Sequence, residues 1–230
     1  MSKKEEIRKK RESQKRKNKL LIVMGIAVFV LLVTAAVVLP FLKANARPVG
    51  EIIVPDSQPR PNADGMAMGD PNASIVLEEY SDFQCKYCKI FADDSEQSIV
   101  EDFVSTGKIY FVYKPFTVIG SESDAAALAA YCAADQNKFW EYHDILFANI
   151  TGAQVGDFLD NRLYAFAEKV GLNMDDFKSC YNSQNFLGQL NADRAAGVAA
   201  RLEGTPAFFV NGVNVSLGDL YSTLAEMVNQ

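Results

Sequence analysis

The sequence predicts an α/β fold with a helical block inserted into it, preceded by one N-terminal transmembrane helix. Three observations indicate this arrangement. An uncharged apolar stretch lies near the N-terminus, β-rich runs alternate with helical patterns in the body of the chain, and a segment of about 80 residues within that body has helical periodicity alone. Removal of this segment leaves a βαβ–ββα unit that can bury one sheet against helices.

The composition is that of a folded protein with an appendage. Of the 230 residues, 49% are hydrophobic and 23% are charged, which is ordinary for one sizeable domain. The net charge of -6 conceals a split: residues 1–19 hold ten Lys and Arg against three Glu, a charge of +7 that leaves -13 for the rest. An acidic body gives no support for nucleic-acid binding, which requires a basic face on the fold itself.

The apolar stretch predicts a membrane anchor. Residues 20–39 (LLIVMGIAVFVLLVTAAVVL) contain no charge, and as a helix they span about 30 Å, the thickness of the hydrocarbon core. The basic residues before it predict a cytoplasmic tail over 1–19, a signal-anchor over 20–42 and an extracytoplasmic remainder. A cleavable signal peptide is the alternative, because Ala44-Asn45-Ala46 is similar to a cleavage site. The length of the stretch favours the uncleaved anchor.

Residues 43–69 are predicted to form a flexible linker, because they show little apolar periodicity and contain Pro48, Pro55, Pro59 and Pro61. The short run Ile52–Val54 could instead form an edge strand, although Pro55 would end it at once.

The folded domain is predicted over 70–230, with its elements in a definite order. Ser74–Tyr80 is a strand, 85–106 is a helix that Gly107 ends, and Ile109–Tyr113 is a second strand. Residues 120–203 form the helical insertion. Asn211-Gly212 then predicts a hairpin between Ala207–Val210 and Val213–Val215, and Leu217–Val228 closes the chain as an amphipathic helix.

Cys85 and Cys88 form a C-x-x-C pair at the start of the first predicted helix. A sulfur in the first helical turn lies near unpaired backbone N–H groups and the positive end of the helix dipole, which favours the reactive thiolate. Cys88, one turn later, can resolve a mixed disulfide on Cys85. A static disulfide or half of a zinc site is the alternative, but zinc needs about four ligands and only Cys132, Cys180 and His143 could join the pair alongside carboxylates. We therefore favour a redox pair and expect no metal and no cofactor.

Three segments resemble the thioredoxin superfamily, specifically DsbA-like proteins with a helical insertion: SIVLEEYSDFQCKYCK, AAYCAADQNKFWEYHDILF and GTPAFFVNG. The resemblance covers about residues 69–230. It implies a thioredoxin fold with Cys85 as the exposed nucleophile and Cys88 as the buried partner. It also implies a cis bond between Thr205 and Pro206, facing the cysteines, where the backbone of Thr205 could pair with an extended substrate.

The resemblance assigns further roles. Glu79 matches the position of the buried acid that accepts the proton in thioredoxin-like proteins, although a solvated strand carboxylate is the alternative. Cys132 and Cys180 match cysteines that can form a structural disulfide; two buried thiols are the alternative.

Lys86 and Tyr87 occupy the substrate-facing positions between the redox cysteines. Lys86 replaces the usual proline of this group, and Tyr87 replaces the histidine of strongly oxidising relatives. The helix start and Lys86 together account for a Cys85 pKa of about 6–7.5. We therefore predict a Cys85 pKa above about 5 and an oxidant weaker than the strongest relatives.

These features predict an extracytoplasmic dithiol–disulfide oxidase. It would act on reduced or unfolded exported polypeptides and be reoxidised by a redox partner in the membrane. A reductase or isomerase of the same fold, or a non-catalytic binding or assembly module, remains an alternative.

Overall fold

The computed structural model describes residues 19, 23–36, 38 and 48–229, and the chain divides into two units after Pro48. In the first unit, residues 23–36 are helical, and the Thr34 hydroxyl donates a hydrogen bond to the Val30 carbonyl oxygen. Among the described residues, no helix combines the length and the apolar character needed to cross a bilayer. Residues 1–18 of the predicted tail and several positions of the predicted anchor (20–22, 37 and 39–42) lie outside the described residues.

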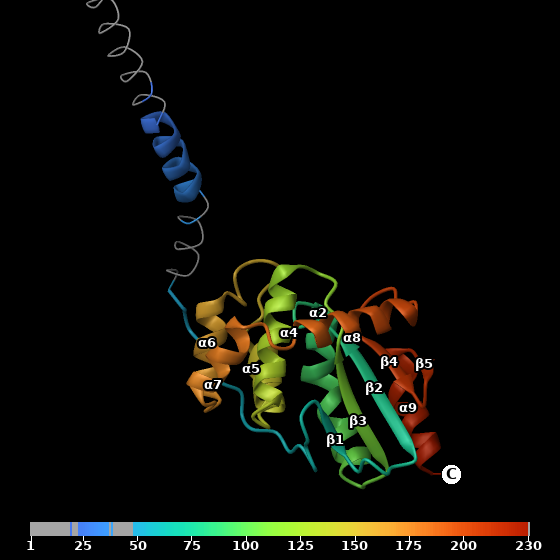
Figure 1. Cartoon of the computed structure of the whole chain (residues 1–230). Coiled ribbons are helices and arrows are strands. Elements are labelled where there is room, and N and C mark those ends of the chain that lie inside the picture. Colours follow the sequence, from blue (N-terminus) through green and yellow to red (C-terminus); the bar gives the residue numbers. More distant parts are fainter. Residues whose placement is uncertain (1–18, 20–22, 37, 39–47, 230) are drawn as a thin grey trace, which may run out of the picture. The chain divides into compact units, whose positions relative to one another are not determined.

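The second unit is built on a five-stranded sheet in the order β1-β3-β2-β4-β5 (Figure 1). Its strands are β1 (Ala67–Gly69), β2 (Ile75–Ser81), β3 (Ile109–Pro115), β4 (Ala207–Val210) and β5 (Val213–Val215). Strands β2 and β3 are parallel, and the other neighbouring pairs are antiparallel. The mixed sheet follows from the chain order, because a helix crosses from β2 to β3 whereas a two-residue turn joins β4 to β5.

The helix after β2 is one continuous helical run with π-helical turns in it. It comprises α2 (Lys86–Phe91), η1 (Ala92–Glu96), α3 (Gln97–Ile99) and η2 (Val100–Val104). Gly107 follows it with a φ of +77°, as expected of a glycine that ends a helix. The closing helix α9 (Leu217–Val228) packs beside this run, since the Phe103 and Tyr221 rings lie 5.0 Å apart.

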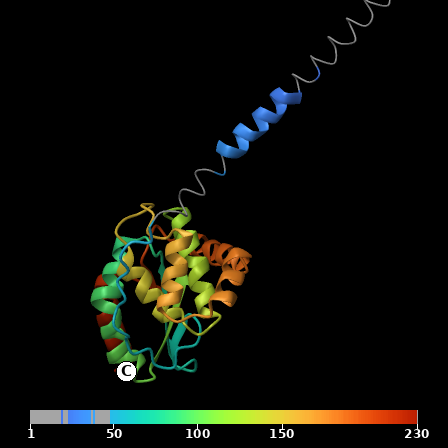
Figure 2. The same cartoon turned by 90° about the vertical axis from the view of Figure 1, so that its left-hand side faces the viewer.

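Between β3 and β4 lies the helical insertion. Its helices are α4 (Ser121–Ala134), α5 (Phe139–Asn149), α6 (Asp160–Lys169), α7 (Met174–Asn182) and α8 (Leu187–Ala199). Helices α4 to α7 gather on one side of the sheet and lie in front of the strands in Figure 2. A disulfide joins Cys132 in α4 to Cys180 in α7, which is the pairing that the family resemblance implies.

One face of the sheet forms the core. Alternate residues of β2 and β3, including Leu77, Glu79, Phe111 and Tyr113, point to this face and are fully or almost fully buried. The parallel register places Glu79 beside Tyr113. Trp140 of α5 packs on Phe111, with ring centroids 5.7 Å apart. The carboxylate that the sequence singles out therefore lies inside the apolar core.

The linker prediction over 43–69 is wrong for residues 49–69; residues 43–47 lie outside the described residues. Ile53 donates its N–H to the Asn149 side chain of α5 and accepts from it in return, at 2.9 and 2.7 Å. Residues 67–69 form β1, so Ile52–Val54 is not the edge strand. We refer to residues 49–66 as the strap. Hydrogen bonds to the Asn149 side chain and the partly buried Arg60 hold the strap in place. Neither leaves an apolar periodicity in the sequence, which is why the sequence predicts a linker there.

The Cys132–Cys180 disulfide is expected to stabilise the fold. It closes a loop of 48 residues, so its removal should lower the free energy of unfolding by about 2–4 kcal/mol through the entropy of the unfolded chain. Urea unfolding of the variant carrying Cys132→Ala and Cys180→Ala measures this loss. Wild-type protein with only Cys85 and Cys88 reduced is the control, and equal midpoints for the two proteins would contradict the expectation.

Candidate functional site

The C-x-x-C pair sits where a buried strand passes into a helix. Cys85 is the residue before α2, with extended backbone angles (φ -80°, ψ 119°), and its N–H donates to the Asp82 carbonyl oxygen at 2.9 Å. Cys88 lies one turn later and is fully buried, whereas Cys85 retains 7% of its surface. Cys85 is thus less exposed than the resemblance implies, but it is the only one of the two sulfurs that solvent can reach.

The Thr205–Pro206 segment lies directly against Cys85. The bond between these residues is cis, and the Cys85 thiol donates to the Thr205 carbonyl oxygen at 3.1 Å. Because Thr205 is 120 residues away in sequence, only the pairing of β2 with β4 brings it here. The segment borders a groove of about 660 Å³ that also involves Phe209 and Asn214.

The pKa of the Cys85 thiol is lowered to about 5. The largest cause is a hydrogen bond from the Cys88 thiol, and burial opposes it. The Thr205 side chain and the backbone N–H groups of Tyr87 and Cys88 add further stabilisation of the thiolate. This value lies below the expected range of about 6–7.5, because that expectation included neither the neighbouring thiol nor Thr205.

Cys88 and Glu79 are perturbed in the opposite sense. Burial is the main cause that raises the pKa of the Cys88 thiol, and its hydrogen bond to Cys85 and the nearby Glu79 add to this effect. Burial also raises the pKa of Glu79 well above its usual range, with a further contribution from Glu96. In the reduced protein, the negative charge therefore lies on Cys85, whereas Cys88 and Glu79 behind it keep their protons.

Asp82 is a site residue that sequence reasoning missed. Its carboxylate is fully buried, accepts the Gln84 N–H at 2.8 Å, and accepts the N–H groups of Val118 and Ile119 at 2.9 and 3.2 Å. It therefore ties the turn before Cys85 to the loop after β3. The signal in the sequence was an acid three residues before Cys85, a position typical of turns and helix starts.

Lys86 and Tyr87 lie on the surface beside the pair. Tyr87 is 55% exposed and the Lys86 ammonium lies 4.7 Å from its ring centroid. Neither side chain is among the groups that lower the Cys85 pKa most. Both are available for contact with a large substrate.

Titration of Cys85 should report its surroundings. With a pKa of about 5, its thiolate fraction should fall only as the pH drops through that value. Removal of a donor should raise the midpoint, more for Cys88→Ala than for Thr205→Val, because the Cys88 thiol is the largest cause. The depressed pKa also predicts that the reduced fold gains stability as the pH rises from about 5 towards the unfolded thiol's value near 8.5.

Ultraviolet absorbance of the thiolate in the reduced protein measures the midpoint. Thr106→Val changes an exposed threonine in the turn after η2 and is the control. A wild-type midpoint above about 7, or no shift in Cys88→Ala, would contradict the assignment.

Comparison with known proteins places the chain in a family. A family model described as thioredoxin matches residues 61–230. The chain is 32% identical over 146 residues to the Na⁺/H⁺ antiporter NhaA 3 of Salinispora tropica, with 63% of this chain and 21% of that protein covered. It is 27% identical over 149 residues to a putative protein-disulfide oxidoreductase of Rickettsia typhi, with 64% and 55% covered.

The fold has a solved counterpart. The structure of oxidised BdbD from Bacillus subtilis matches with a TM-score of 0.67 at 20% identity, over 76% of this chain and 98% of that one. The chain spans about a fifth of the antiporter and about half of the Rickettsia protein. Since the family model covers most of its length, the chain belongs to the thioredoxin family, with the helical insertion that its DsbA-like members carry.

Proposed function

We propose that the chain is an extracytoplasmic thiol–disulfide oxidoreductase that forms disulfides in reduced exported polypeptides. The observation that carries the proposal is the asymmetry of the cysteine pair: the accessible sulfur has a low pKa and the buried one a high pKa. A substrate thiolate would attack Cys85 in the Cys85–Cys88 disulfide, and Cys88 would leave. A second substrate thiolate would then attack the mixed disulfide, and Cys85 would leave as a stable thiolate.

The electrostatics favour an oxidase over a reductase. A thiolate stabilised at pH 7 makes the reduced pair more stable, so the disulfide form accepts electrons more readily. The name of the Rickettsia typhi relative, a putative protein-disulfide oxidoreductase, supports this reaction class. The same asymmetry argues against a non-catalytic binding module, in which nothing requires one sulfur to be acidic and its neighbour buried.

The other residues receive roles from their positions. Glu79 exchanges a proton with Cys88, since it lies near that thiol and burial favours its neutral form. Thr205 and Pro206 lie against Cys85 and present backbone to an extended polypeptide. Lys86 and Tyr87 contact the substrate beside the reacting sulfur.

Membrane attachment completes the proposal. The uncharged stretch 20–39 and the ten basic residues before it support an anchor with a cytoplasmic N-terminus. Anchoring would hold the domain near a membrane redox partner that reoxidises the cysteine pair.

Cysteine variants test the reaction. In Cys88→Ala, the Cys85 thiolate should attack a disulfide of an oxidised polypeptide, release one of its sulfurs as a thiolate, and accumulate as a mixed disulfide because Cys88 is not there to resolve it. Cys85→Ser should form no such adduct and lose turnover. Non-reducing gels measure the adducts. The variant without the Cys132–Cys180 bridge is the control, since it retains the redox pair. Equal trapping by Cys85→Ser and Cys88→Ala would contradict the assigned roles.

Membrane attachment can be tested separately. The full chain should remain in the membrane fraction after alkaline extraction, and an impermeant thiol reagent should label Cys85 in intact reduced cells. Leu31→Arg should weaken insertion, since an arginine near the helix centre costs about 2.5–3.5 kcal/mol. A soluble mature protein that begins just after Ala46 would instead establish the cleavable signal peptide.

A further inference from the structure

A group of buried polar side chains lies behind Cys88, and we call it the buried polar cluster: Glu79, Ser81, Tyr113, Glu96 and His143. Each of these residues is at most 2% exposed. Each also has a side-chain atom that makes no hydrogen bond of standard geometry with another described residue: Glu79 Oε2, Ser81 Oγ, Tyr113 Oη, Glu96 Oε2 and His143 Nε2. Buried polar atoms are nearly always paired with protein or internal water, so a group of such atoms calls for an explanation.

The inner end of the cluster reaches the resolving cysteine. The Ser81 hydroxyl lies close enough to the Glu79 carboxyl, the Cys88 thiol and the Tyr113 hydroxyl to oppose, in each of the three groups, the rise in pKa that burial causes. This arrangement follows from the sheet, because Glu79 and Ser81 share one face of β2 and Tyr113 is paired with Glu79 in β3. A proton on Cys88 therefore has acceptors on its buried side.

The outer end of the cluster consists of Glu96 and His143. The His143 ring lies edge-on to the Tyr113 ring, with centroids 5.3 Å apart, and its Nε2 lies 3.5 Å from Glu96 Oε2. Its Nδ1 is paired with Asp144 Oδ1 at 2.8 Å. Glu96 also acts on Glu79 directly, as the second cause of that group's raised pKa. The two ends of the cluster are thus electrostatically connected.

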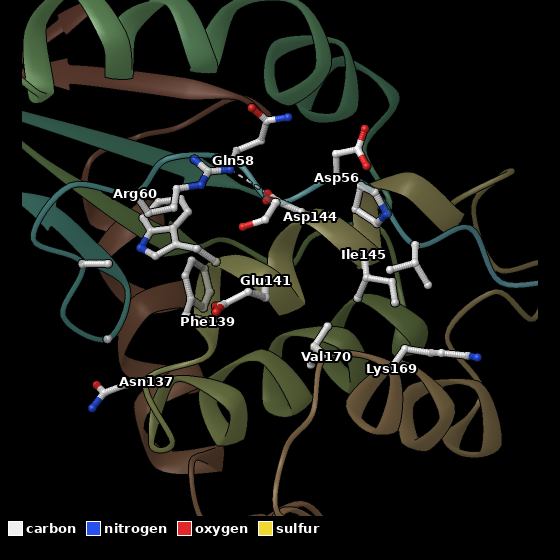
Figure 3. A pocket seen from close by; sticks show the side chains of 16 residues that line it. Asp56, Gln58, Arg60, Asn137, Phe139, Glu141, Asp144, Ile145, Lys169 and Val170 are labelled. Carbon is white, nitrogen blue, oxygen red and sulfur yellow. Dashed lines mark hydrogen bonds and ion pairs between the residues drawn. The ribbon is translucent and has the colours of Figure 1, made fainter.

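The outer end borders solvent. Glu96 and His143 line a pocket of about 370 Å³ together with Arg60, Asp93 and Asp144. Arg60 reaches in from the strap and pairs with Glu96. It also pairs with Asp144 at 2.6 Å, and Figure 3 shows this second ion pair in the adjoining pocket that Arg60 and Asp144 also line. Its guanidinium supplies the positive charge that the two acids face, and it does so where Glu96, His143 and Asp144 lie close enough together to ligate a metal ion. Arg60 also lies 4.7 Å over the Trp140 ring and so has a fixed position at the rim.

We propose, on the basis of the proposed oxidoreductase function, that Glu96 and His143 relay the proton that Glu79 exchanges with Cys88 to and from solvent in this pocket. A bound polypeptide would cover the Cys85 side of the site, whereas the pocket behind Glu96 would stay open. The groups that face Glu79 and set its proton affinity are Glu96, Arg60 and Ser81, with Tyr113 and the two cysteines.

Each half-reaction moves one proton through the relay, inward in the first and outward in the second. When a substrate thiolate attacks Cys85, the S–S bond breaks, Cys88 leaves with the electron pair and takes a proton from Glu79, and the relay returns one proton to Glu79. During reoxidation by a disulfide partner, the relay first carries the proton of Glu79 to solvent. Glu79 then takes the proton of Cys88, whose thiolate attacks Cys85 in the mixed disulfide, and the partner's sulfur leaves with the electron pair.

A two-phase reaction separates the two cysteines. The reduced full chain in detergent micelles is mixed with an aromatic nitrobenzoate disulfide whose thiolate product is coloured. Attack by Cys85 releases the first coloured thiolate, and resolution by Cys88 releases the second. Glu96→Gln and His143→Gln should each slow the second phase about tenfold, which is less than the usual effect of removing a direct general acid or base. The rate of the first phase should stay within about twofold of the wild-type rate. The second phase should also acquire a changed pH profile and an acceleration by small buffers.

The matched control is Glu101→Gln, the same change of charge on the same helical run at an exposed carboxylate, and it should leave both phases unchanged. An unchanged second phase in both relay variants would overturn the relay, and equal slowing of both phases would show that the cluster only supports the fold.

In the wild type, the second phase should show the larger solvent deuterium effect, and equal effects on the two phases would also count against the relay. A wild type without a second phase would instead refute the proposed oxidoreductase function.

Discussion

The burial of Cys88 directly behind Cys85 is the constraint on which the site depends. One helical turn separates the sulfurs, yet only Cys85 touches solvent. The buried thiol serves as a donor to its neighbour, so the pKa of Cys85 falls while that of Cys88 rises. A C-x-x-C pair with both sulfurs in water would lack this difference. The strand-to-helix junction creates it, because Cys85 precedes α2 and keeps some contact with solvent, whereas Cys88, one turn later, is on the buried side of the helix with Phe91.

The helical insertion helps to hold this junction in position. Asp82 fixes the turn before Cys85 to the loop after β3. Gln84 donates to the Ser123 hydroxyl of α4 at 3.1 Å and accepts the Gln154 N–H through its side-chain oxygen. Movement of the insertion relative to the sheet would therefore disturb the turn that leads into the nucleophile. The buried Asp82 carboxylate, which accepts three backbone N–H groups, is the strongest of these ties.

The strap supplies a positive charge, that of Arg60, beside the two acids at the rear of the site. Glu96 is almost fully buried within an apolar helix face, and an unpaired carboxylate there would be costly. Arg60 pairs with it and with Asp144, and its own pKa is raised by these acids against the effect of burial. The domain accordingly includes the strap, and the buried charges behind Glu79 depend on a residue that precedes the first strand.

The sequence by itself determined the elements whose signals are local. The hairpin Ala207–Val210 and Val213–Val215 and the closing helix Leu217–Val228 have the predicted bounds, because Asn211-Gly212 and the Ser216 cap act within a few residues. The C-x-x-C pair was also accessible through motif spacing, and the buried position of Glu79 through the family resemblance. Only the tertiary structure decided the course of the strap, strand β1, the roles of Asp82 and Arg60, and a Cys85 pKa below expectation. Each of these depends on groups far apart in sequence, such as Thr205 at Cys85 and Arg60 at Asp144. A single hydrogen bond or ion pair leaves no periodic pattern, so it becomes visible only when the fold brings its two partners together.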